Sequence, residues 1–99
     1  MIGRVDNAEP VTYVEFAREL GNNLKRVREA KGLTVEEVAE KAKISTTTYR
    51  DYERGRTRRR TPPNPSMLSL LTVLWALGVN WEDVAPERMP DLHPNGGLY

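Results

Sequence analysis

Residues 34–54 read TVEEVAEKAKISTTTYRDYER, and this stretch decides the fold of the chain. It predicts two short amphipathic helices joined by a tight turn. The first helix is expected to begin after Thr34, because Thr34 and Glu37 have the spacing of a capping box. Its apolar side chains recur at helical spacing and are expected to face inward: Val38, Ala39 and Ala42. The small side chain of Ala39 lets a second helix cross closely.

The second helix is expected to begin after Ser45, a favourable capping residue, with Ile44 filling the turn before it. Tyr49 and Tyr52 recur at helical spacing, so they are predicted to lie in the core and not to stack on a ligand. Gly55 would end this helix. The face opposite the tyrosines is then polar and outward: Thr46, Thr47, Arg50, Asp51 and Arg54.

Positive charge is concentrated around this second helix. Residues 43–60 carry seven basic and two acidic groups, a net charge of +5, whereas residues 1–42 and 61–99 carry −1 and −3. The whole chain of 99 residues has a net charge of only +1, so the cationic region is a local feature. A helix with short polar side chains beside a dense cation cluster fits a polyanion that has a groove, and duplex DNA is such a ligand.

A longer helix is expected to precede this stretch. It would begin after Thr12, which has Glu15 at capping-box spacing, and end at Gly32, where a left-handed residue is needed. Apolar side chains form one stripe along it: Phe16, Leu20, Leu24 and Val27. Gly21 within this helix costs about 1 kcal/mol relative to alanine, so the helix is expected to bend or restart there.

The C-terminal half predicts one more helix and a short turn. Residues 56–63, RTRRRTPP, are expected to form neither helix nor strand, because the arginines repel one another and the prolines block both. The next helix is expected to have Asn64 as its cap and Pro65 as its first residue, and to end at Gly78. A last short turn is expected over 81–84, WEDV.

These elements predict an all-α, compact five-helix domain. The helix-turn-helix domain would span residues 12–85, between a flexible N-terminal arm, 1–11, and a flexible C-terminal tail, 86–99, which is rich in proline and glycine. The chain has no cysteine, which excludes disulfides and thiolate metal sites. Its apolar runs are too short to span a membrane and no signal pattern opens it, so a cytoplasmic location is expected.

The predicted fourth helix, PSMLSLLTVLWALG, is apolar on more than one side. Its expected inward stripe consists of Met67, Leu70, Leu71, Leu74 and Leu77. The surplus apolar residues are predicted to form a homodimer interface: Leu68, Val73, Trp75 and Trp81. Alternatively, the segment around residues 13–16 or the C-terminal tail would fold over this surface.

The chain also resembles a known family over residues 20–84. The resemblance is carried by the run 24–34, LKRVREAKGLT, by Glu37-Val38-Ala39, by Ile44-Ser45, by Tyr52-Glu53-Arg54-Gly55 and by Ala76-Leu77-Gly78-Val79. Together these are similar to the lambda-repressor-like, Xre/Cro-type helix-turn-helix domain. The resemblance implies a five-helix bundle that binds operator DNA as a homodimer and regulates transcription, often as a repressor. Two positions depart from the family: Val35 stands where glutamine is frequent, and Lys43 where glycine is frequent. The arginine-rich connection before the fourth helix is also longer.

In this motif the N-terminal half of the second helix enters the major groove. The expected base contacts are therefore Thr46, Thr47, Thr48, Arg50 and Asp51, of which Asp51 more readily orients Arg50 or Arg54. The expected phosphate contacts are Lys43, Arg54, Arg56, Arg58, Arg59 and Arg60, joined by the N-terminus of the first helix of the motif. The arginine run would alternatively reach into a narrow minor groove.

The predicted function is a sequence-specific, double-stranded DNA-binding transcriptional regulator of bacterial or phage type. The alternative is an antitoxin or another regulator that binds a partner protein through the apolar surface of the fourth helix. An enzyme is not expected, because the chain has no cysteine, no glycine-rich phosphate loop and a single histidine, His93, in the tail. No cofactor and no metal are expected.

Overall fold

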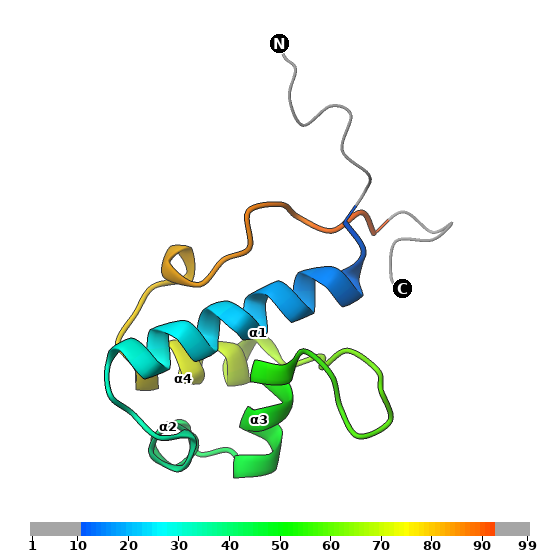
Figure 1. Cartoon of the computed structure of the whole chain (residues 1–99). Helices are drawn as coiled ribbons and strands as arrows, with labels where there is room; N and C mark the ends of the chain where they lie inside the picture. Colours follow the sequence, from blue (N-terminus) through cyan, green and yellow to red (C-terminus); the bar gives the residue numbers. More distant parts are fainter. Residues whose placement is uncertain (1–10, 93–99) are drawn as a thin grey trace.

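The structure is a computed structural model that describes residues 11–92 (Figure 1). Its elements are four α-helices and one 3-10 turn: α1 (Tyr13–Ala30), α2 (Val35–Ala42), α3 (Thr46–Arg54), α4 (Met67–Leu77) and η2 (Trp81–Asp83). The predicted all-α, lambda-repressor-like architecture is confirmed, with a single 3-10 turn as its fifth element. No strand occurs in residues 11–92.

Polar side chains start the helices where the sequence predicts. Thr12 Oγ1 accepts a hydrogen bond from the Glu15 amide at 3.1 Å, and the Thr12 amide donates to Glu15 Oε1 at 2.9 Å. Thr34 and Glu37 form the same reciprocal pair at 3.0 and 2.8 Å. Ser45 accepts from the backbone of α3 in the same way. These caps satisfy amides that have no partner within the helix, so each helix begins at a defined residue.

The start of α4 corrects the prediction that Asn64 caps it and Pro65 is its first residue. The cap is Ser66, whose Oγ accepts from the Ser69 amide at 3.0 Å, and the helix begins at Met67. A residue that precedes proline disfavours the helical conformation, which keeps Asn64 extended. The buried Pro63 is also tied to α1, because the Tyr13 hydroxyl donates to its carbonyl at 2.8 Å. The helix α4 therefore begins after the segment that is attached to α1.

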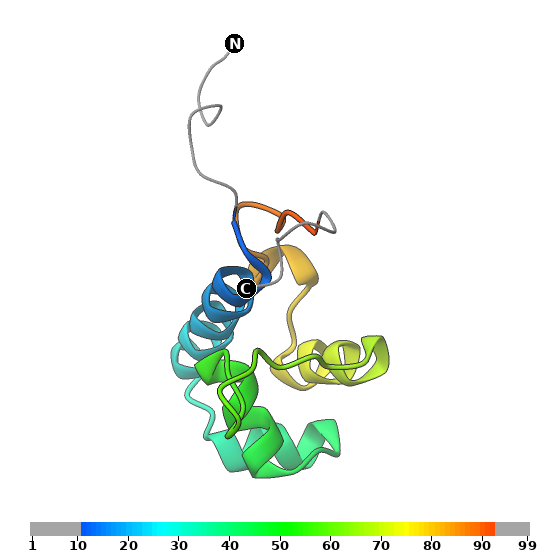
Figure 2. The same cartoon turned by 90° about the vertical axis from the view of Figure 1, so that its right-hand side faces the viewer.

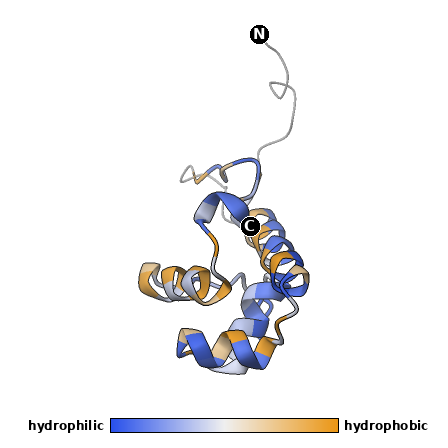
Figure 3. Ribbon diagram, turned by 90° about the vertical axis from the view of Figure 1, so that its left-hand side faces the viewer, coloured by the Kyte–Doolittle hydropathy of each residue, from blue (hydrophilic) through white to orange (hydrophobic). Residues whose placement is uncertain are grey.

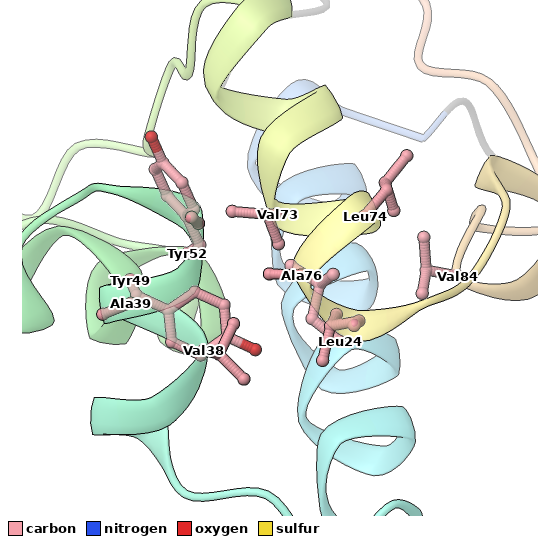
Figure 4. Packing of buried hydrophobic residues seen from close by; sticks show 11 residues of the cluster. Leu24, Val38, Ala39, Tyr49, Tyr52, Val73, Leu74, Ala76 and Val84 are labelled. Carbon is pink, nitrogen blue, oxygen red and sulfur yellow. The ribbon is translucent and has the colours of Figure 1, made fainter.

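The hydrophobic core lies where α1, α2, α3 and α4 meet (Figure 4). Tyr49, Val73 and Val84 are fully buried, and Leu24 and Val38 are 1 % exposed. Core residues come from every helix, so no pair of helices is stable by itself. Figure 3 shows that α4 is the most continuously apolar of the helices, whereas α1 and α2 combine apolar and hydrophilic residues and α3 is hydrophilic along its length.

The helix α1 is continuous through Gly21, so the predicted bend or restart is wrong. Gly21 is buried, and a Cβ atom there would lie 2.4 Å from the carbonyl oxygens of Tyr52 and Glu53. The missing side chain therefore allows the last turn of α3 to pass directly against α1. Glycine at this position is a packing requirement of the α1–α3 contact.

Residues 86–92 run beside α1 rather than over α4 (Figure 1). The Asp91 amide donates to the Val11 carbonyl at 2.9 Å, and the Glu87 amide donates to Glu19 Oε2 at 3.1 Å. The predictions for the remainder of the arm and the tail, His93 included, fall on residues outside those described. In the part of the chain that the structure describes, no helix combines the length and the apolar character needed to cross a membrane.

We expect Gly21→Ala to destabilise the fold by about 1–3 kcal/mol, because the added methyl group meets backbone atoms that cannot move aside. Within a helix, alanine is otherwise more favourable than glycine. A lower free energy of unfolding would therefore report the steric conflict at the α1–α3 contact. Urea unfolding measures this change. The control is Gly32→Ala, where the space is open and only the backbone conformation, φ +71°, opposes a side chain. A Gly21→Ala variant as stable as the wild type would refute this explanation.

Candidate nucleic-acid interface

The tight turn between α2 and α3 depends on one left-handed residue. Lys43 has φ 64° and ψ 37°, in the region that favours glycine. A lysine there costs about 1–2 kcal/mol. Ile44 follows, and its amide donates to the Ala39 carbonyl at 3.0 Å. The turn therefore keeps the helix-turn-helix geometry although glycine is absent.

The inner face of α3 anchors it to the rest of the domain. Tyr49 is fully buried and Tyr52 is 9 % exposed, as predicted. Burial raises the pKa of the Tyr49 hydroxyl far above its ordinary value, and the nearby Glu53 carboxylate adds to this effect. The phenol is therefore neutral at physiological pH and serves as a core side chain.

A buried ion pair, which the sequence analysis did not predict, joins α3 to α1. Arg28 Nε lies 2.6 Å from Glu53 Oε2, and the two side chains are only 12 % and 8 % exposed. A second hydrogen bond, Arg28 Nη2 to Glu53 Oε1, measures 3.2 Å, and Arg28 Nη1 donates to the Leu33 carbonyl at 2.8 Å. The hydrogen bond to Glu53 raises the pKa of Arg28. A signal exists in the sequence: Arg28 follows Leu24 by four residues and Glu53 follows Tyr49 by four, so both fall on buried stripes.

The outer face of α3 presents the predicted polar side chains to different degrees. Thr47, Arg50 and Arg54 are exposed, and Thr46, Thr48 and Asp51 are partly buried. The structure thus brings five of these six together on one surface. Thr48 differs, because its Oγ1 accepts from Ser45 Oγ at 2.8 Å and is used in the cap.

Both arginines on this face have carboxylate partners. Asp51 Oδ1 accepts from Arg54 Nη2 at 3.1 Å, so Asp51 orients Arg54 and not Arg50. Arg50 Nη2 instead donates to Glu36 Oε2 on α2 at 2.9 Å, and both side chains of this pair are about half exposed or more. The sequence analysis missed Glu36, because the two residues are fourteen positions apart and meet only when α2 and α3 cross.

The arginine-rich connection lies directly after α3 and projects as a loop beside it (Figure 1). Arg56, Arg58, Arg59 and Arg60 are all exposed. Gly55 ends α3 in the left-handed conformation, φ 72°, and packs against the backbone of Arg18. The loop therefore leaves α3 in a fixed direction and places its cations next to Arg54.

The outer face of α4 corrects part of the predicted dimer interface. Leu68 and Trp75 are 71 % and 65 % exposed, but Val73 is fully buried and belongs to the core. Trp81 is 39 % exposed and packs against Phe16 of α1 with ring centroids 6.5 Å apart. Figure 2 shows α4 at the edge of the molecule.

The predicted inward stripe of α4 is also partly wrong. Met67 and Leu71 are 78 % and 54 % exposed, whereas Leu74 and Leu77 are buried as predicted. The helix is apolar on most sides, so its hydrophobic pattern does not reveal how it is rotated. The outward apolar row consists of Met67, Leu68, Leu71 and Trp75.

Among residues 11–92, no cluster of histidine, aspartate or glutamate side chains has the composition and proximity of a metal site. An apolar hollow of about 140 Å³ lies between α1, Pro63, Pro65 and Leu70. It contains no arrangement of acid, base and nucleophile.

We expect Arg28→Ala to destabilise the domain by about 3–5 kcal/mol, because it leaves the Glu53 carboxylate buried without a partner. A double variant, Arg28→Met with Glu53→Leu, should lose much less stability, because no charged group then remains buried. Urea unfolding compares the two. Equal losses in the single and double variants would mean that the ion pair does not act as a unit.

Comparison with known proteins gives a consistent result. The helix-turn-helix domain family matches residues 19–79. The clp gene regulator ClgR from C. glutamicum is 33 % identical, with 77 % of this chain and 86 % of that chain covered and a TM-score of 0.60. The restriction-modification controller protein C.AhdI from Aeromonas hydrophila is 26 % identical, with 69 % and 94 % covered and a TM-score of 0.59.

A third similar structure is the master regulator for biofilm formation SinR, solved in complex with DNA. It is 32 % identical, with 64 % of this chain and 92 % of that chain covered and a TM-score of 0.52. The curated proteins contain no match to this chain. The family match spans more than half of the chain, and the folds agree over nearly the whole length of these regulators. The chain therefore belongs to the helix-turn-helix family of DNA-binding transcriptional regulators, of the lambda-repressor-like, Xre/Cro type.

Proposed function

We propose that this protein represses transcription by binding a specific operator in duplex DNA with α3 in the major groove. The observation that carries the proposal is the exposed polar face of α3, held outward by a fully buried Tyr49 and by the Arg28–Glu53 pair. A helix anchored in this way presents side chains in fixed positions, which direct base readout requires. The similarity to SinR, which was solved in complex with DNA, supports DNA as the ligand.

The proposed base contacts are Thr46, Thr47 and Arg50. A threonine hydroxyl donates or accepts a hydrogen bond, and its methyl group contacts the thymine methyl. The planar guanidinium of Arg50 suits O6 and N7 of guanine. Asp51 and Thr48 support these contacts by orienting Arg54 and by capping α3.

The proposed phosphate contacts are cations that surround this face. The residues are Lys43, Arg54, Arg56, Arg58, Arg59 and Arg60. Glu36 and Glu37 place two carboxylates at the N-terminus of α2, which disfavours a phosphate at that helix end. The backbone contacts therefore concentrate on the C-terminal side of α3.

Selection of bound duplexes from a random library at a stated salt concentration tests the proposal. We expect an enriched operator whose affinity falls steeply with salt, because each neutralised phosphate releases a counterion. Arg50→Ala should then lower discrimination at one base pair by about 1–3 kcal/mol. The control, Arg58→Ala, should weaken all duplexes similarly.

The Arg50→Ala substitution also leaves the Glu36 carboxylate without its partner, and that negative charge would itself repel DNA. The double variant Arg50→Ala, Glu36→Gln removes the charge, so it measures the lost Arg50–base contact alone. Sequence preference that survives Arg50→Ala in both backgrounds would show that the recognition residues lie elsewhere. A chain that retains no duplex even at low salt would refute the proposed function.

We further propose that the protein is a homodimer formed through the outward row of α4. Leu68, Leu71 and Trp75 are spaced by three and four residues, so they form one continuous apolar strip with Met67 beside it. A large exposed apolar strip of this kind marks an interface. Lys41 lies 5.0 Å above the Trp75 ring, at the edge of this strip. An isologous contact would place two copies of α3 in successive major grooves, about 34 Å apart.

We expect the Leu68→Glu, Trp75→Glu double variant to sediment as a monomer, because the contact would bury two carboxylates against apolar groups. Met89→Glu makes the same kind of change at a side chain that is 75 % exposed outside α4, and it should leave the assembly unchanged. The operator should also show two symmetric half-sites.

The second candidate, a regulator that binds a partner protein through this strip, is favoured if the wild-type chain is monomeric. A chain that sediments identically with and without the two α4 substitutions would exclude the dimer proposed here. The same variants then identify the partner surface, because they should abolish a co-purifying complex without loss of folding.

A further inference from the structure

The arginine-rich connection is an ordered turn and not an open loop. The Thr57 amide donates to the Thr61 carbonyl at 2.7 Å, and the Arg60 amide donates to the Thr57 carbonyl at 3.0 Å. The hydroxyls of Thr57 and Thr61 lie 2.8 Å apart, and the Arg59 amide donates to Thr57 Oγ1 at 3.2 Å. These bonds close residues 57–61 into a ring, called here the threonine clasp.

The clasp holds like charges together at a conformational cost. Residues 56–60 include four arginines and no acidic residue, and mutual repulsion would favour an extended loop. Within residues 11–92, Arg56, Arg58, Arg59 and Arg60 have no carboxylate partner. Arg60 also adopts φ 63°, a left-handed conformation that favours glycine. A strained turn that concentrates uncompensated charge indicates a bound anion.

The turn encloses a hollow of about 230 Å³ that suits such an anion. Its lining residues are Arg54, Arg56, Thr57, Arg58 and Arg60, with no carboxylate among them. Guanidinium groups present planar pairs of donors that match phosphate oxygens. The hollow therefore has the donor type of a phosphate site.

The amount of charge distinguishes the ligand from the DNA backbone. One phosphodiester carries a single negative charge. Four arginines line this one hollow, and only Arg54 is already paired, with Asp51. A phosphodiester would leave most of this charge unmatched, whereas two or three linked phosphate groups would balance it.

We infer that the threonine clasp forms a binding site for a small molecule that carries linked phosphate groups, such as a diphosphate or triphosphate. Binding itself does not depend on the proposed function. The effect of this binding on DNA affinity does rest on the proposed function, because Arg54 and the loop arginines are also proposed phosphate contacts. The ligand and the DNA backbone would compete for them, so the apparent DNA affinity would fall by the factor 1 + [ligand]/Kd.

Calorimetric titration of the full chain with inorganic pyrophosphate, without DNA, tests the site directly. Sulfate at equal ionic strength is the comparison for general charge effects. We expect pyrophosphate to bind at least about tenfold more tightly than sulfate, the effect of one additional hydrogen bond to a charged group. Equal affinities for the two anions would overturn the inference.

Three variants locate the site. Arg60→Gly removes one guanidinium and keeps the left-handed turn, and it should weaken pyrophosphate binding by about tenfold. Thr57→Val removes the clasp hydroxyl without changing charge or branching, and it should also weaken binding. Lys31→Ala removes one positive charge at the far end of α1, beside Gly78, and should have little effect. A loss with Lys31→Ala as large as with Arg60→Gly, or no loss with Thr57→Val, would contradict a preformed site.

A displacement assay separates this inference from the proposed function. Pyrophosphate added at constant ionic strength should release the selected operator from the wild type but much less from Arg60→Gly. If operator binding is normal and pyrophosphate does not bind, the inference falls and the proposed function stands. If pyrophosphate binds but the chain retains no duplex, the proposed function falls and the site stands.

Discussion

The close contact between α1 and the last turn of α3 is the constraint on which the rest of the structure depends. Two features of the sequence make it possible. Gly21 leaves room for the α3 backbone, and the buried Arg28–Glu53 pair fixes the rotation of α3 about its own axis. A buried ion pair requires a particular geometry, so the Arg28–Glu53 pair favours the orientation of α3 that the structure shows. That orientation turns Tyr49 inward and Arg50 outward.

The electrostatics of the outward face follow from this orientation. Arg50 meets Glu36, and Arg54 meets Asp51, so the helix surface is nearly balanced. The uncompensated charge lies in the adjoining turn, residues 56–60. In a DNA-binding protein this arrangement would divide the work between two segments. The turn would supply sequence-independent attraction to phosphates. The arginines of the balanced helix would contact bases only where base edges replace their carboxylate partners.

The outer face of α4 is apolar, in contrast to the polar and charged outer face of α3. The helix α4 is apolar on both its core face and its outer face, so Val73 and Trp75, two residues apart, have opposite environments. An exposed apolar face of this kind on a small domain marks an interaction site. The proposed DNA-reading surface and the apolar strip belong to different helices, α3 and α4.

The sequence by itself determined the starts of α1, α2 and α3, the turn and the inward tyrosines, because capping residues, glycines and amphipathic spacing act within a few residues. It also predicted the polar face of α3, since that face is the complement of a clear apolar stripe. It did not determine the rotation of α4, because a helix apolar on all sides has no periodicity to read. The tertiary structure alone decided the partners of Arg28 and Arg50 and the role of Gly21. Those contacts join residues 25, 14 and about 30 positions apart, and only the crossing of helices brings them together.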